Sequence, residues 1–102
     1  MVHLVAFITA HPGKRTELLA AFHGIVPTVR AENGCVEYTP VVDHEAFGDF
    51  GPPLGPDTYV VIEKWASPEA LRAHSAAPHM KTFGASAKNL IAKRVLHVLS
   101  PA

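Results

Sequence analysis

This chain of 102 residues has little cysteine, no net charge and no long apolar run. Its single cysteine, Cys35, excludes an internal disulfide and suits a reducing compartment, so we expect a cytoplasmic protein. Nine basic and nine acidic residues leave no basic excess, which argues against nucleic acid or an anionic membrane surface as a partner. No segment approaches the roughly 20 apolar residues that a membrane-spanning helix needs.

The chain does contain enough apolar sequence for one core. Apolar residues make up 48% of the composition and charged residues 18%, which is typical of a folded domain. The length predicts a single domain over residues 1–102. A domain this small has little packing to spare for a ligand cavity, so a ligand-binding version is expected to recover buried area by oligomerising.

The first half of the chain predicts a strand, a helix and a second strand. Residues 2–9 form a strand that is apolar on both faces. Apolar residues then recur at helical spacing until Asn33 and Gly34, and Gly34 is the expected left-handed cap of that helix. Pro40, within the strand of residues 35–43, indicates either a position at the edge of a sheet or a bulge.

The second half predicts a strand, a broken helix and a last strand. Residues 58–65 are rich in β-forming side chains and again apolar on both faces. Pro68 is expected at the first position of a helix, and Pro78 breaks this helix and starts another. Residues 91–99 carry apolar side chains on both faces of the last strand.

The resulting order, β-α-β-β-α-β, predicts an α+β fold of the ferredoxin-like type. In this arrangement one antiparallel four-stranded sheet is covered by helices on one face only. The strands are nevertheless apolar on both faces, and a bare apolar face of that size would be unusual on a soluble monomer. We therefore expect a homodimer in which two sheets pack face to face, with His3 and His97 at the interface.

A loop of thirteen residues, Glu45 to Asp57, interrupts the pattern between the two middle strands. It holds three glycines and three prolines, so we expect it to lack regular structure. Loops of this length in small domains are often lids or contact elements. Phe47 and Phe50 are the expected contact residues, either over a substrate pocket or against the other subunit.

Two of the seven histidines, His74 and His79, flank the helix break at Pro78. Two imidazoles beside an apolar cavity can serve as a base and an orienting donor. The alternative is that each only hydrogen-bonds the backbone. We expect no metal, because the spacing crosses a proline and lacks a nearby carboxylate or thiolate set. Between the two, His79 at a helix start is the preferred base, and His74 the orienting residue.

Other polar residues have simpler interpretations. Glu63 and Trp65 share one face of the third strand with Tyr59, and a carboxylate among apolar neighbours needs a partner. Arg94 on the last strand is the expected ion-pair partner of Glu63. Cys35 is more simply a small buried thiol than a nucleophile. No glycine-rich loop links a strand to a helix, so no phosphate-binding loop is predicted.

Several short motifs, in this order, resemble the antibiotic-biosynthesis monooxygenase family, and most of all its bacterial quinol monooxygenases. The similarity covers nearly the whole chain. The motifs are Ile25-Val26-Pro27-Thr28-Val29, Glu32-Asn33-Gly34-Cys35 with Tyr38, Glu63-Lys64-Trp65, the Ala70-Leu71 to His74 segment, and Pro78-His79-Met80-Lys81.

The resemblance implies a dimeric α/β barrel and an oxygenation that needs no metal, flavin or haem. A quinol or phenol would lose a proton, pass an electron to O₂ and leave as a quinone. His74 and His79 correspond to the helix histidines of the family and Trp65 to its strand tryptophan, while Tyr59 and Asn33 are looser correspondences for substrate binding.

Three alternatives stay open because the family is functionally mixed. One is a non-enzymatic dimer that binds an aromatic ligand. A second is an isomerase of a small phosphorylated signalling molecule, for which the available cations are Arg72, Lys81, Lys93 and Arg94. The third is a haem-degrading enzyme, which is the least favoured because such relatives use an asparagine on the first strand and residues 2–8 contain none.

Overall fold

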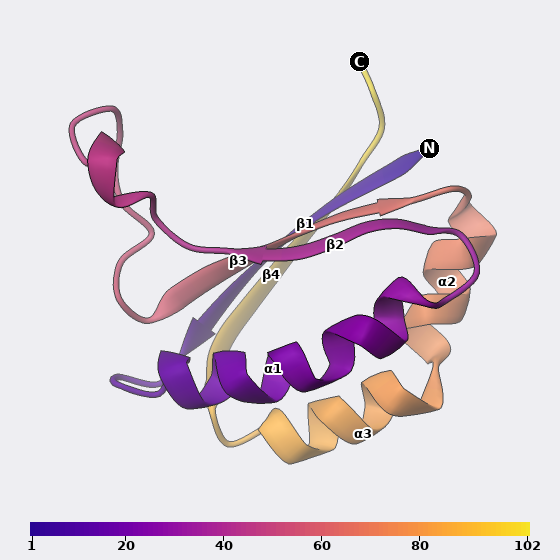
Figure 1. Cartoon of the computed structure of the whole chain (residues 1–102), viewed down its shortest axis with the longest axis horizontal. Helices are drawn as coiled ribbons and strands as arrows, with labels where there is room; N and C mark the ends of the chain where they lie inside the picture. Colours follow the sequence, from indigo (N-terminus) through magenta and orange to yellow (C-terminus); the bar gives the residue numbers. More distant parts are fainter.

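The computed structural model describes residues 1–102 as one antiparallel sheet with helices on one side (Figure 1). The strand order is β2-β3-β1-β4, and all three strand pairs are antiparallel. This confirms the ferredoxin-like α+β prediction. The elements are β1 (Val2–Ala10), α1 (Arg15–Arg30), β2 (Cys35–Val41), the 3₁₀ helix η1 (Glu45–Phe47), β3 (Thr58–Trp65), α2 (Pro68–Ala76), α3 (Pro78–Ala87) and β4 (Ile91–Leu99).

The core lies between the central strands and α1. Alternate side chains of β1 and β3 point at the helices, because successive strand residues face opposite sides of a sheet. They meet the buried face of α1, whose apolar residues recur every three or four positions. The main buried contributors are Leu4, Ala6, Ile8, Leu18, Phe22, Val26, Val29, Tyr59, Val61 and Trp65.

The turn from α1 to β2 is built around Gly34, although not as expected. Helix α1 ends at Arg30, and its C-cap is Ala31 in an ordinary helical conformation. Gly34 has the positive φ of 84° three residues later, just before β2. A Cβ at Gly34 would lie 2.6 Å from the Cβ of Ala70, so the absence of a side chain lets α2 approach this turn.

Strand β2 is an edge strand, as Pro40 predicted. Its pairing with β3 shifts register between Cys35 and Glu37 and then places Tyr38 opposite Glu63. Strand β4 forms the other edge, where its side chains lie further from the helices. Leu96 and Val98 on its helix-facing side are 42% and 61% exposed.

The second sheet face carries apolar side chains and no helix (Figure 1). In the register of the strands, Val5 lies opposite Ile62 and Phe7 opposite both Val60 and Val95. His97 pairs with Val5 on this same face, as expected. The only other chain segment beside it is the loop before β3, where Leu54 borders a cavity of about 330 Å³ together with Phe7 and Val95. No helix in the chain is both long and apolar enough to cross a membrane.

The loop between β2 and β3 is anchored at its base and projects from the sheet (Figure 1). The carboxylate of Asp43 accepts hydrogen bonds from the backbone of Leu54 and Gly55 at 2.8 and 3.0 Å, which lowers the pKa of Asp43. The expected lack of regular structure is wrong at its start, because residues 45–47 form a 3₁₀ turn whose N-cap, His44, accepts from the backbone of Ala46.

Replacing Gly34 with alanine should destabilise the fold. The positive φ costs a residue with a side chain about 1–2 kcal/mol, and the new methyl group would also collide with Ala70. Gly24→Ala is the matched control, because Gly24 lies in α1 with open space around it and should gain about 0.5–1 kcal/mol. Urea unfolding gives the free energy of unfolding of both variants. A Gly34→Ala variant as stable as Gly24→Ala would contradict the proposed need for glycine at position 34.

Candidate active site

A cavity of about 550 Å³ lies between the helix-facing side of the sheet and helices α2 and α3. Its size is within the range of small-molecule sites. Apolar side chains such as Leu4, Ile8, Phe22 and Leu71 make up most of the wall. The remaining wall is polar or charged and consists of Tyr38, Tyr59, Glu63, His74, Ser75, Lys81, Lys88 and Arg94.

His74 is the imidazole in the cavity wall, and the start of α2 fixes its position. Ser67 caps this helix by accepting a hydrogen bond from the backbone of Ala70 at 3.1 Å, and Pro68 follows as the first helical residue. His74 is 5% exposed, and its ring packs on Trp65 with 4.6 Å between ring centroids. Tyr38 contacts the ring edge-on at 5.5 Å. The imidazole therefore has little freedom to rotate.

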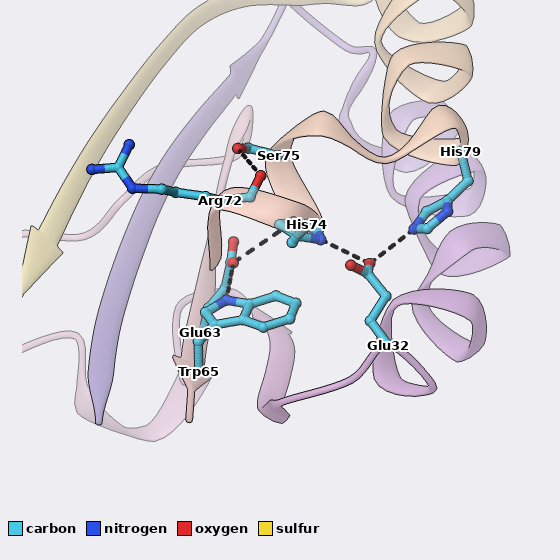
Figure 2. A network of polar contacts seen from close by, with 7 residues as sticks. All are labelled: Glu32, Glu63, Trp65, Arg72, His74, Ser75 and His79. Carbon is cyan, nitrogen blue, oxygen red and sulfur yellow. Dashed lines mark hydrogen bonds and ion pairs between the residues drawn. The ribbon is translucent and has the colours of Figure 1, made fainter. Parts of the chain in front are cut away.

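A single carboxylate oxygen joins the two histidines (Figure 2). Oε2 of Glu32 lies 2.8 Å from Nδ1 of His74 and 2.8 Å from Nε2 of His79. An ionised carboxylate only accepts hydrogen bonds, so His74 carries its proton on Nδ1 in this arrangement. The Nε2 lone pair of His74 is then available on the side that faces Glu63, and both of these residues line the cavity.

Glu63 is a buried carboxylate whose partner is Trp65. Its Oε1 accepts a hydrogen bond from the indole Nε1–H of Trp65 at 2.9 Å and lies 3.9 Å from Nε2 of His74. The expected ion pair with Arg94 is wrong, because Arg94 has no carboxylate within 4.0 Å. Burial raises the pKa of Glu63, and the Trp65 hydrogen bond and the nearby positive charges offset this only in part.

Two phenolic side chains complete the polar wall. Tyr38 is 2% exposed and Tyr59 is 1% exposed, and desolvation raises the pKa of each far above its ordinary value. Both phenols therefore keep their protons, so each can donate a hydrogen bond to a bound oxygen but neither can act as a base.

The structure separates the residues that the sequence suggested as a site. His74 and Tyr59 line the cavity, and Trp65 is fully buried behind His74. The expectation that His79 faces the cavity is wrong. Its ring turns back from the start of α3 toward Glu32 and is 29% exposed at the side chain (Figure 2).

Three other suggested residues lie away from the cavity of their own chain. Asn33 is exposed in the turn before β2. Phe47 and Phe50 are 52% and 83% exposed on the projecting loop, where they contact each other edge-on at 5.2 Å. These two residues therefore do not form a lid over the cavity of their own chain. A contact with another subunit stays a prediction.

Sequence reasoning missed Glu32 and Tyr38 as site residues and gave Glu63 only a structural ion pair. Glu32 was visible only as part of the motif that precedes Gly34. Tyr38 and Glu63 do carry a signal, because each is in phase with apolar neighbours that face the helices. Their position opposite each other depends on the strand register.

The same cluster contains the donors that a metal ion would require. One ligand atom each from Glu32, His74 and His79 lies within 4.8 Å of the others. The expectation that no carboxylate accompanies the histidines is thus wrong, and nitrogen and oxygen donors of this kind suit Zn²⁺. Both oxygen-to-nitrogen distances are ordinary hydrogen-bond lengths, so the three groups also satisfy one another without an ion.

Comparison with known proteins identifies the fold family. The family model described as "Antibiotic biosynthesis monooxygenase" matches residues 1–86. The chain belongs to this family. A relative from Escherichia coli (strain K12), named "Probable quinol monooxygenase YgiN", is 38% identical over 103 residues, which cover 99% of this chain and 98% of the relative.

Solved structures share the fold of this chain. PA3566 from Pseudomonas aeruginosa superposes with a TM-score of 0.82 at 26% identity, covering 99% of this chain and 93% of the other. Rv0793 from Mycobacterium tuberculosis has a TM-score of 0.80 at 24% identity, with 99% and 94% covered, which shows a shared fold.

Replacing Glu63 with glutamine should stabilise the protein at neutral pH. The raised pKa means that folding favours the protonated form, so the ionised carboxylate lowers stability above its ordinary pKa near 4.3. Glutamine keeps an oxygen for Trp65 without the charge. The stability advantage, measured by thermal unfolding across pH, should shrink as pH falls below about 4. Glu37→Gln, at a partly exposed ion pair, should change stability by less than about 1 kcal/mol.

Proposed function

We propose that this protein is a cofactor-independent monooxygenase that oxidises a quinol or related phenol with O₂ to a quinone. The observation that carries the proposal is the imidazole of His74 in an otherwise largely apolar cavity, held at Nδ1 by Glu32 and open at Nε2. Membership of the family and the relative named as a quinol monooxygenase support the same activity.

Substrate deprotonation is the step for which the site is best arranged. A phenolic hydroxyl placed near Nε2 of His74 can give its proton to this nitrogen, and Glu63 and Tyr38 are the polar residues beside the His74 ring. Transfer from an ordinary phenol to an ordinary imidazole is uphill by about 3–4 pKa units, or ~5 kcal/mol. The carboxylate of Glu32 offsets part of this cost because it stabilises the imidazolium.

The apolar wall contributes to the steps that follow. A phenolate in a cavity with little water reacts with O₂ without competing protonation from solvent. Insertion of one oxygen atom and loss of water convert a phenol with a free ring position into the quinone. The remaining tasks of the protein are to orient the ring and to exclude water, which the packed side chains of β1, α1 and α2 can do.

His74 is therefore the proposed base, in place of His79, which the sequence favoured. His74→Asn should lower kcat/KM by about 10²–10⁴, because asparagine offers Glu32 an N–H but provides no base. His79→Asn should lower it less than tenfold, since His79 is outside the cavity wall. Oxygen consumption with reduced naphthoquinones and anthrones measures both variants, with circular dichroism as the folding control.

The same assay tests the whole proposal. Labelled ¹⁸O₂ should place one atom in the quinone product, and activity should persist in a chelator and without added flavin or haem. Loss of activity in chelator that returns with Zn²⁺ would instead assign the Glu32 cluster to a metal. A protein that binds the quinol but consumes no oxygen would be a binding protein and not an oxygenase.

We also propose that the protein is a homodimer in which the open sheet faces pack together. Val5, Phe7 and Ile62 are only partly buried within one chain and would otherwise present an apolar face to water. Sedimentation at micromolar concentration should give a mass of about twice 10.9 kDa. Ile62→Glu should shift this toward the monomer, whereas Val98→Glu, on the opposite face of the sheet, should not. A monomeric wild-type protein would contradict the proposal.

A further inference from the structure

Three cationic side chains line the outer part of the cavity, and they come from two facing elements. Lys81 lies in α3, and Lys88 is the C-cap of this helix in a helical conformation. Their spacing of seven residues places them on one side of the helix and about 10 Å apart along its axis. Arg94 comes from β4, where it pairs with Ile8 and therefore shares the helix-facing side of the sheet. The cavity thus has positive charge on two walls.

None of these three cations has a partner within the chain. No carboxylate lies within 4.0 Å of any of them, and none donates a side-chain hydrogen bond. Three of the other six cations are engaged, because Lys64 pairs with Glu37 at 3.1 Å and Arg15 and Arg30 donate to backbone carbonyls. Lys14, Arg72 and Lys93 are also unpaired, but none of them lines this cavity. A chain with equal numbers of acids and bases therefore leaves these positive charges unpaired at one cavity.

The cavity wall itself provides little negative charge to balance them. Its only carboxylate is Glu63, which is buried and hydrogen-bonded to Trp65. The charge of Arg94 acts on the buried side chains of the cavity. Burial raises the pKa values of Glu63, Tyr38 and Tyr59, and Arg94 lowers each of them by a smaller amount.

Gly84 leaves space between the two lysines. It also lines the cavity, and a Cβ placed on it would meet no atom within 4 Å. The stretch of α3 between Lys81 and Lys88 therefore has an open position in the wall. A ligand group at this position would lie between the two lysine side chains and would not collide with other atoms of the protein.

We propose that the substrate is an aromatic compound with a carboxylate group, and that Lys81, Lys88 and Arg94 bind this carboxylate. This rests on the proposed function, because the phenolic end of the same molecule would lie at His74. The apolar wall between the two ends holds the ring. The cations then select substrates by charge and fix which end of the ring faces the base.

Binding of compounds that cannot be oxidised tests the charge preference separately from turnover. Naphthalene-2-carboxylate and naphthalene-2-carboxamide have the same ring and differ in charge. We expect the carboxylate to bind roughly tenfold more tightly by calorimetry at low ionic strength, with the difference reduced by salt. Ribose 5-phosphate, which is anionic but not aromatic, should not compete at similar concentrations.

The variants identify the residues responsible. Lys81→Gln combined with Lys88→Gln, and separately Arg94→Gln, should weaken binding of the carboxylate more than binding of the carboxamide and so bring the two affinities toward equality. Lys93→Gln is the matched control, because Lys93 is next to Arg94 but faces the other side of the sheet. It should keep the wild-type preference.

The outcomes separate this proposal from the proposed function. Equal affinities for the two compounds in the wild type, no binding of either, or competition by ribose 5-phosphate would overturn the anionic aromatic assignment, whether or not quinols are oxidised. A tenfold preference with no oxygen consumption would support it while refuting the oxygenase. With an active enzyme, a carboxylated quinol should have a KM roughly tenfold below its amide, with similar kcat.

Discussion

The arrangement of the site depends on one carboxylate oxygen that is shared by two imidazoles. Oε2 of Glu32 connects the turn after α1 with α2, through His74, and with α3, through His79. Glu32 lies more than forty residues before either histidine in the sequence. A buried carboxylate is costly without partners, and each imidazole would lose its rigid orientation without the carboxylate. The catalytic geometry and the packing of the two helices are therefore parts of the same interaction.

Close packing makes this arrangement geometrically possible. Gly34, two residues after Glu32, has no side chain where α2 approaches, so Ala70 can contact the turn. Trp65 then fills the space beneath His74 and uses its indole N–H to hold Glu63. The two carboxylates therefore flank one imidazole at opposite nitrogens, and they differ in role. Glu32 supports a positive charge on the ring, while Glu63, with its raised pKa, is biased toward the neutral form.

The polar residues of the cavity differ in burial. His74, Glu63 and the two tyrosines, whose hydroxyls stay protonated, are buried, so hydrogen bonding and proton transfer are concentrated there. The unpaired cations, Lys81, Lys88 and Arg94, are exposed. A cavity that combines a buried base with exposed positive charge suits a ligand with two different polar groups. The apolar wall of the cavity is formed by residues such as Leu4, Ile8 and Phe22.

The sequence alone determined the order of the elements, the edge position of β2 and the presence of apolar residues on both faces of the central strands. These features follow from local periodicity and from proline chemistry, which act over a few residues. Only the tertiary structure decided which histidine lines the cavity, that Glu32 joins both, and that Trp65 and not Arg94 is the partner of Glu63. Those contacts depend on where α1 ends, on the register of β2 against β3 and on the direction in which α3 leaves Pro78. They join residues far apart in the chain, so periodicity carries no information about them.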